Sequence, residues 1–252
     1  AIPRAAYLFK PWNNDVLSDP RFSLHIEDGR QFLLRSDEKY DVVIVDSTHP
    51  KAVDSWILYT VDFYEVARSK LADEGILVQW LPLHGLSENE FKVIVRSFLE
   101  AFPTMTLWLN VGVESYGQAA YAKLVGSTAP LKIDYHELAL RLGEPRIQKD
   151  LAPWGMDSPI EILDLFVADA DHLRGFVSKV PPQTDDRPFI PYITEFSNGP
   201  RMEASALLPI RSSVMPLLYN MGEDEPTIER DLQRAFEATG FLMADMLPQA
   251  AR

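Results

Sequence analysis

Apolar and polar positions in the first half of the chain alternate between the spacing of strands and the spacing of helices. Residues 22–27 (FSLHIE) alternate as a strand does, and residues 30–36 (RQFLLRS) follow with the pattern of a short helix. Residues 41–46 (DVVIVD) are a continuous apolar run, which is typical of a parallel strand buried on both faces. Residues 75–81 (GILVQWL) predict another buried strand.

Two stretches beside these strands carry apolar residues at helical spacing, residues 61–71 and 87–102. In the second stretch Ser87 can cap the helix together with Glu90, which stands three residues later. Two further strands are expected after it, at residues 105–110 (MTLWLN) and 120–127 (AYAKLVGS). Strands that alternate with helices in this way predict a doubly wound, parallel α/β sheet.

The pattern changes at about residue 130, where short helical segments replace the alternation. Residues 134–142 and 158–167 have helical spacing, and residues 184–192 (TDDRPFIPY) predict a rigid, extended segment. Residues 226–242 form one amphipathic helix in a tail that is an added helical hairpin or a docking element. We therefore expect three parts: a Rossmann-like core at 1–130, a helical and extended part of the same domain at 131–200, and a helical tail at 201–252.

Composition and net charge narrow the classes of protein and of partner that fit this sequence. The chain of 252 residues is 46% hydrophobic and 24% charged, which is ordinary for a globular protein. No apolar run approaches bilayer length and no leader is present, so we expect a cytoplasmic or already processed protein. Its net charge of −13 argues against nucleic acid as a partner and suits a cationic substrate such as a polyamine. The absence of cysteine excludes disulfides and thiolate catalysis.

Candidate chemistry lies where the predicted strands end, because ligands bind at the carboxyl edge of parallel sheets. Asp28 and Asp46 each follow a predicted strand, so both can face a ligand at that edge. The alternative is that each aspartate caps a helix or forms a turn, which aspartate often does at such junctions. His49 and His84 also follow strand ends, but no ligand spacing joins them and no metal is expected.

Several ordered motifs resemble the spermidine synthase family, the polyamine aminopropyltransferases. They are DPRFSLHIEDGRQFLL, KYDVVIVDSTHP, LYTVDFYEVARSKLADEGILVQWLPLHGL and AFPTMTLWL. Together with TDDRP, they are most similar to a bacterial branch that is fused to transporter-like membrane helices. The resemblance covers about residues 5–195 and implies a class I methyltransferase-like Rossmann fold. It also implies transfer of an aminopropyl group from decarboxylated S-adenosylmethionine to an amine such as putrescine, without a metal.

The resemblance assigns roles to individual residues. Asp28, with Gly29 in the same DGR motif, matches the adenine-binding position, and Asp46 matches the carboxylate that deprotonates the attacking amine. The amine pocket is matched by Gln79, His49 and Tyr116. His49 departs from the family because it replaces a second aspartate, and a neutral or cationic ring would weaken a diamine site.

A second departure concerns the start of the fold. The family begins with a glycine-rich GGGxG turn and two strands that this sequence lacks. In the strand order 3-2-1-4-5-7-6 these strands lie between FSLHI and DVVIV, so their loss leaves a gap. Three functions stay open: an aminopropyltransferase whose site another chain or a missing segment completes, a catalytically silent subunit of a larger and perhaps membrane-associated complex, or an S-adenosylmethionine-dependent methyltransferase.

Overall fold

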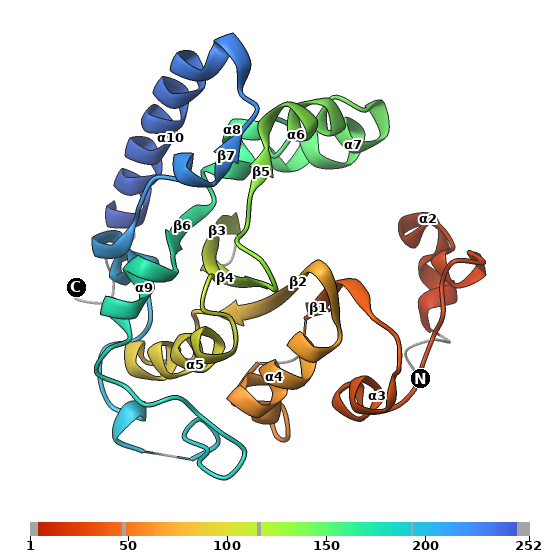
Figure 1. Cartoon of the computed structure of the whole chain (residues 1–252), viewed down its shortest axis with the longest axis vertical. Coiled ribbons are helices and arrows are strands. Elements are labelled where there is room, and N and C mark those ends of the chain that lie inside the picture. Colours follow the sequence, from red (N-terminus) through yellow and green to blue (C-terminus); the bar gives the residue numbers. More distant parts are fainter. Residues whose placement is uncertain (1–4, 47–48, 115–116, 193, 246–252) are drawn as a thin grey trace. The chain divides into compact units, whose positions relative to one another are not determined.

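The computed structural model describes residues 5–46, 49–114, 117–192 and 194–245 (Figure 1). The chain divides into two compact units, Ala1–Ser36 and Asp37–Arg252.

The first unit is small and helical. It contains α2 (Lys10–Asn13) and α3 (Gly29–Arg35), with single 3₁₀ turns at Tyr7–Phe9 and Val16–Ser18. The predicted short helix is confirmed by α3. The predicted strand at 22–27 is wrong: these residues form no strand, and their apolar side chains Phe22, Leu24 and Ile26 are exposed. An alternating pattern makes a strand only when a neighbour satisfies its backbone and covers one face, and no described segment does so here.

A five-stranded sheet forms the centre of the second unit, in the order β1-β2-β4-β3-β6 (Figure 1). Its strands are β1 (Tyr40–Val45), β2 (Leu71–Pro82), β3 (Thr106–Glu114), β4 (Gly117–Ser127) and β6 (Phe166–Asp169). β1 and β2 are parallel, whereas β4 runs antiparallel to both β2 and β3. The α/β class is therefore confirmed, but the expectation of an all-parallel sheet is wrong. The order β1-β2-β4-β3 is the 4-5-7-6 half of the order that the family resemblance implies.

Helices α4 (Val61–Ser69) and α5 (Glu88–Ala101) pack on one face of this sheet. Aromatic side chains fill the contact, with Tyr64 edge-on to Phe98 and Phe98 stacked on Phe102. The capping box predicted for α5 is confirmed, because the Ser87 hydroxyl accepts the Glu90 N–H while Glu90 accepts the Ser87 N–H. The predicted helical stripe of this segment is buried throughout.

The opposite face of β1 is open. Val42 and Ile44 are 50% and 68% exposed, and Ile44 lies beside Val78 of β2 on that face. The expectation that this apolar run is buried on both faces is therefore wrong for the described chain. β1 is the edge strand of the sheet, and among the described residues it pairs only with β2.

The remaining helices and strands lie between residues 133 and 245. They are β5 (Ile133–Asp134), α6 (Tyr135–Leu142), α7 (Pro145–Leu151), α8 (Pro159–Leu163), α9 (Ala170–Phe176), β7 (Leu218–Tyr219) and α10 (Glu225–Asp245). Residues 158–167, expected to be helical throughout, leave the helix after Leu163 because Phe166 to Ala168 pair with β3. The predicted tail helix is confirmed by α10, whose Ile228 and Leu232 join an apolar cluster with Leu163 and Phe166.

The segment around TDDRP is tied to the two sheet-covering helices. Gln183 is fully buried, and its N–H donates to the Ser97 hydroxyl of α5 at 2.7 Å. The Asp185 carboxylate accepts the Thr60 hydroxyl at 2.8 Å, and the Asp185 N–H donates to Asp62 at 2.9 Å. The motif therefore fastens this segment to the start of α4. Within the described residues, no helix is both long and apolar enough to cross a bilayer.

Candidate functional site

The two parallel strands bring Asp46 and Gln79 to one edge of the sheet. Asp46 directly follows β1, and Gln79 of β2 is the register partner of Val45. Asp46 therefore lies one residue beyond the register partner of Gln79, at the same carboxyl edge of the sheet. Asp46 is exposed, and among the described residues its carboxylate has no hydrogen-bond or ion-pair partner.

Gln79 is fully buried and only partly satisfied. Its Nε2 donates to the Trp80 carbonyl at 3.0 Å and reaches the Val45 carbonyl at 3.5 Å. These two acceptors fix which end of the amide is the donor. Its Oε1 is buried without a partner in the described part of the chain, which costs about 1–3 kcal/mol. A ligand N–H at this position would remove that cost.

His49 is held by both of its ring nitrogens. Its Nδ1 accepts the Lys51 backbone N–H at 3.1 Å, and its Nε2 lies 2.8 Å from the His84 carbonyl oxygen. A carbonyl can only accept, so Nε2 carries the proton and the ring is the neutral Nε2–H tautomer. Neither nitrogen is left for an amine in this arrangement, and contact of His49 with substrate stays a prediction.

Gly85 makes this hydrogen bond possible. Its φ of +76° lies in the left-handed region that favours glycine. A Cβ built on Gly85 would stand 2.7 Å from the Nε2 of His49, closer than van der Waals contact allows. The loop after β1 and the turn after β2 therefore meet through the His49 ring and the bare Gly85 backbone.

A second attachment follows immediately along the same loop. The Lys51 ammonium lies 2.8 Å from Oε2 of Glu90, whose side chain is fully buried in the capping box of α5. Removal of the Lys51 ammonium would leave the buried Glu90 carboxylate without its cation, which is strongly destabilising. The loop that begins at Asp46 is thus anchored at His49 and again at Lys51.

An aromatic row borders the anchored loop. Tyr121 of β4 lies 5.5 Å from the Trp80 ring and edge-on to His84 at 6.1 Å, measured between ring centroids. His84 lies 5.5 Å from His49. Sequence patterns do not identify Trp80, Tyr121 and Lys51 as neighbours of the site. Tyr121 reaches Trp80 because β4 pairs antiparallel to β2, and Lys51 reaches Glu90 across 39 residues of chain. The one sequence feature that pointed to these neighbours was the position of Trp80 and His84 at the end of a predicted strand.

Three predicted residues lie in other parts of the chain than the second unit's described residues: Asp28, Gly29 and Tyr116. Asp28 caps α3, with its Oδ1 accepting the Gln31 N–H at 2.8 Å, as the capping alternative expects. Gly29 begins α3, and a Cβ there would meet no atom within 4 Å. Both belong to the first unit. Tyr116 lies outside the described residues. Across the described ranges, no three acidic or histidine side chains gather as metal ligands do.

Comparison with known proteins gives consistent matches. The sequence model of the spermine/spermidine synthase domain matches residues 6–134, just over half of the chain. The polyamine aminopropyltransferase of Saccharolobus solfataricus is 35% identical over 97 residues, which are 38% of this chain and 32% of that protein. The polyamine aminopropyltransferase of Korarchaeum cryptofilum is 30% identical over 172 residues, covering 68% of this chain and 51% of that protein.

Among solved structures, a probable spermidine synthase from Corynebacterium glutamicum is similar at 18% identity and a TM-score of 0.47. The match covers 78% of this chain and 63% of that one. The chain spans between about a third and a half of the length of the two curated relatives described above.

Proposed function

The chain belongs to the spermine/spermidine synthase family, and from that premise we propose that it transfers an aminopropyl group from decarboxylated S-adenosylmethionine to a small amine. The observation that carries the proposal lies at the carboxyl edge of β1 and β2. The exposed Asp46 follows Val45, the register partner of the buried Gln79, and Oε1 of Gln79 lacks a partner among the described residues. One group can take a proton, and the other can accept an N–H from the same amine.

In the proposed reaction the amine nitrogen attacks the aminopropyl carbon bonded to the sulfonium sulfur. The new C–N bond forms as the C–S bond breaks, and the electron pair leaves with sulfur in methylthioadenosine. The proton of the amine passes to Asp46. Because the sulfonium is already a good leaving group, the protein mainly aligns a neutral nucleophile. A negative surface also favours a cationic acceptor, and the chain carries a net charge of −13.

We propose that Asp28 and Gly29 bind the adenosyl part, and that additional polypeptide completes this half of the site. The support is the open edge of β1, which pairs only with β2 among the described residues, together with the exposed Val42 and Ile44. An added strand would pair with the backbone of β1 at the edge that faces away from β2. It could come from a partner chain or from a preceding segment.

A catalytically silent subunit of a larger assembly is the second candidate. Two observations favour it: Asp28 already caps α3, and both nitrogens of His49 are engaged. A silent subunit would keep the anchored loop for its structural value alone.

Calorimetric titration separates these candidates. Methylthioadenosine and S-adenosylmethionine are each titrated into the isolated chain and into the assembly purified with it. The proposal expects methylthioadenosine to bind to the assembly, and the chain alone to bind it at least about tenfold more weakly. Binding of neither ligand to the assembly would favour the silent subunit, and clear preference for S-adenosylmethionine would favour a methyltransferase.

A further inference from the structure

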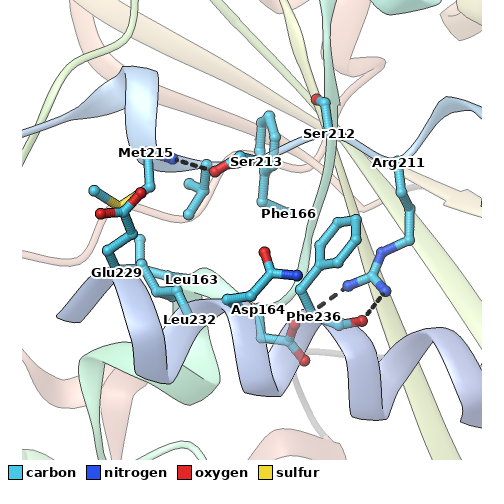
Figure 2. A pocket seen from close by; sticks show the side chains of 12 residues that line it. Leu163, Asp164, Phe166, Arg211, Ser212, Ser213, Met215, Glu229, Leu232 and Phe236 are labelled. Carbon is cyan, nitrogen blue, oxygen red and sulfur yellow. Dashed lines mark hydrogen bonds and ion pairs between the residues drawn. The ribbon is translucent and has the colours of Figure 1, made fainter. Parts of the chain in front are cut away.

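A cavity of about 240 Å³ lies in the second unit, in a part that the proposed reaction does not use (Figure 2). One wall is α10, which contributes Glu229, Leu232 and Phe236. The opposite wall is the segment 211–215, and residues of α8 and β6 close the remaining side. Leu232 belongs to an apolar cluster with Phe166 and Val214, so the cavity has an apolar lining on three sides.

At one end of the cavity lies a buried ion pair whose two side chains are already engaged in contacts within the protein (Figure 2). Arg211 donates from Nη1 to the Phe236 carbonyl at 2.7 Å and from Nη2 to Asp164 at 3.2 Å. Its guanidinium lies over the Phe236 ring at 4.0 Å, and its side chain is only 3% exposed. The Thr239 hydroxyl donates to the other Asp164 oxygen. The pair therefore fastens α10 to the core and offers a ligand no net charge.

The lining has one further charged side chain, Glu229, and no ion pair of the described residues engages it. Glu229 stands at the opposite end of the cavity, beside Met215 in Figure 2. No cation of the described residues pairs with its carboxylate; Arg230 and Arg234 of the same helix pair instead with Asp231. The Ser213 hydroxyl oxygen accepts the Met215 N–H at 3.2 Å, so its own O–H stays able to donate.

From this lining we propose that the cavity binds a small organic cation, a primary amine with an apolar body. The ammonium would pair with Glu229, and the body would lie against Leu232, Val214 and Phe166. An anion such as a phosphate is disfavoured, because the cation of the lining, Arg211, already serves Asp164 and the backbone. This site is separate from the proposed aminopropyl-transfer site and does not depend on that function.

A ligand there touches both α10 and the segment 211–215, so binding would stabilise the docking of the tail helix. The free energy of a ligand that binds only the docked state adds to the stability of that state. Hydrogen exchange in α10 should therefore slow when the cavity is occupied.

The test uses three probes of equal length on the whole chain: hexylamine, hexanol and hexanoate. Calorimetry should give binding in the order hexylamine, hexanol, hexanoate, and hexylamine should raise protection of α10 from exchange. Glu229→Gln should weaken hexylamine about fivefold, the upper range for a solvent-facing ion pair, and leave hexanol unchanged. Glu223→Gln, an equal change outside the lining, should leave both unchanged.

The proposal would be overturned by no hexylamine binding at about 10 mM, by hexanoate binding as well as hexylamine, or by full hexylamine affinity in Glu229→Gln. Asp46→Asn distinguishes the two sites. It should leave hexylamine affinity unchanged, and a loss there would place the amine at the sheet edge instead.

Discussion

His49 stands three residues after Asp46, and the two side chains have different tasks at the same edge. Sequence patterns place both of them beyond a strand end, which the structure supports. They do not show that the His49 ring spans two loops, since His84 and Gly85 come from a distant part of the chain. The sequence therefore predicts that His49, in place of a carboxylate, changes the amine site. Only the fold shows that His49 anchors the loop after β1 to the turn after β2.

Replacing Gly85 with alanine tests this anchor. Gly85→Ala should lower the free energy of unfolding by about 2–4 kcal/mol, because it adds a contact with His49 to the strain of a positive φ. Gly222→Ala is the matched control, since Gly222 also has a positive φ (+67°) but would meet no atom within 4 Å. It should cost about 1 kcal/mol. Urea unfolding measures both.

The double variant His49→Ala with Gly85→Ala completes the comparison. Removal of the ring should relieve the contact and leave a Gly85 cost close to that of Gly222→Ala. An unchanged cost of Gly85→Ala in the absence of the ring would show that His49 and Gly85 do not meet as described.

At the scale of elements, the helices with one apolar face were predicted well and the strands less so. The apolar spacing of α5 and α10 and the capping residues of α5 are local signals. β6 was not predicted, because an apolar run after a helix continues the helical pattern and only its pairing with β3 makes it a strand. The strand prediction for residues 22–27 is wrong for the opposite reason, because these residues have strand spacing but no described strand pairs with them.

Arg211 should decide how firmly α10 is docked. Arg211→Met removes the hydrogen bond to the Phe236 carbonyl and leaves Asp164 partly buried without its cation, so unfolding should become easier by about 3 kcal/mol. Hydrogen exchange should rise mainly in α10. Arg234→Met removes only an exposed pair and should change stability by less than about 0.5 kcal/mol. Equal effects of the two changes would contradict the assigned role of Arg211.

The change of the free energy of unfolding with pH should depend in part on Asp164. Burial raises the pKa of Asp164 above its usual 3.8, although Thr239 and Arg211 offset part of this rise. A carboxyl group with a raised folded pKa stabilises the fold below its unfolded pKa and loses that contribution as pH rises through the folded pKa. The stability of the wild type relative to Asp164→Asn should therefore fall as pH increases from 3.8. A rise over the same interval would contradict the effect of burial.

At the scale of the whole molecule, the sheet order and the family were within reach of the sequence, but the state of the β1 edge was not. The motifs predict the order 4-5-7-6, and the structure confirms it in β1-β2-β4-β3. An apolar run such as Val42 to Val45 suggests burial, yet burial depends on neighbours that the run itself cannot reveal. The exposed Val42 and Ile44 are a surface at which further polypeptide would gain contact area.

Ile44→Lys tests this edge. In the isolated chain it should change the free energy of unfolding by less than about 0.5 kcal/mol, because Ile44 is 68% exposed. It should reduce self-association in sedimentation velocity, since open apolar edge strands pair with one another. Leu140→Lys on α6 alters a leucine that is 57% exposed and lies away from the edge, and it should leave association unchanged. If both variants behave alike, the β1 edge is not an interaction surface.

The most direct test of the proposed function is aminopropyl transfer by the Asp46→Asn variant. Turnover of decarboxylated S-adenosylmethionine with putrescine is measured in the assembly that contains the chain, with Asp41→Asn on the same strand as the control. Asp46→Asn should lower turnover at least about 100-fold, the contribution of a positioned general base, at an unchanged melting temperature. Asp41→Asn should retain wild-type turnover. Near-normal turnover in Asp46→Asn, or none in the wild-type assembly, would contradict the proposed function.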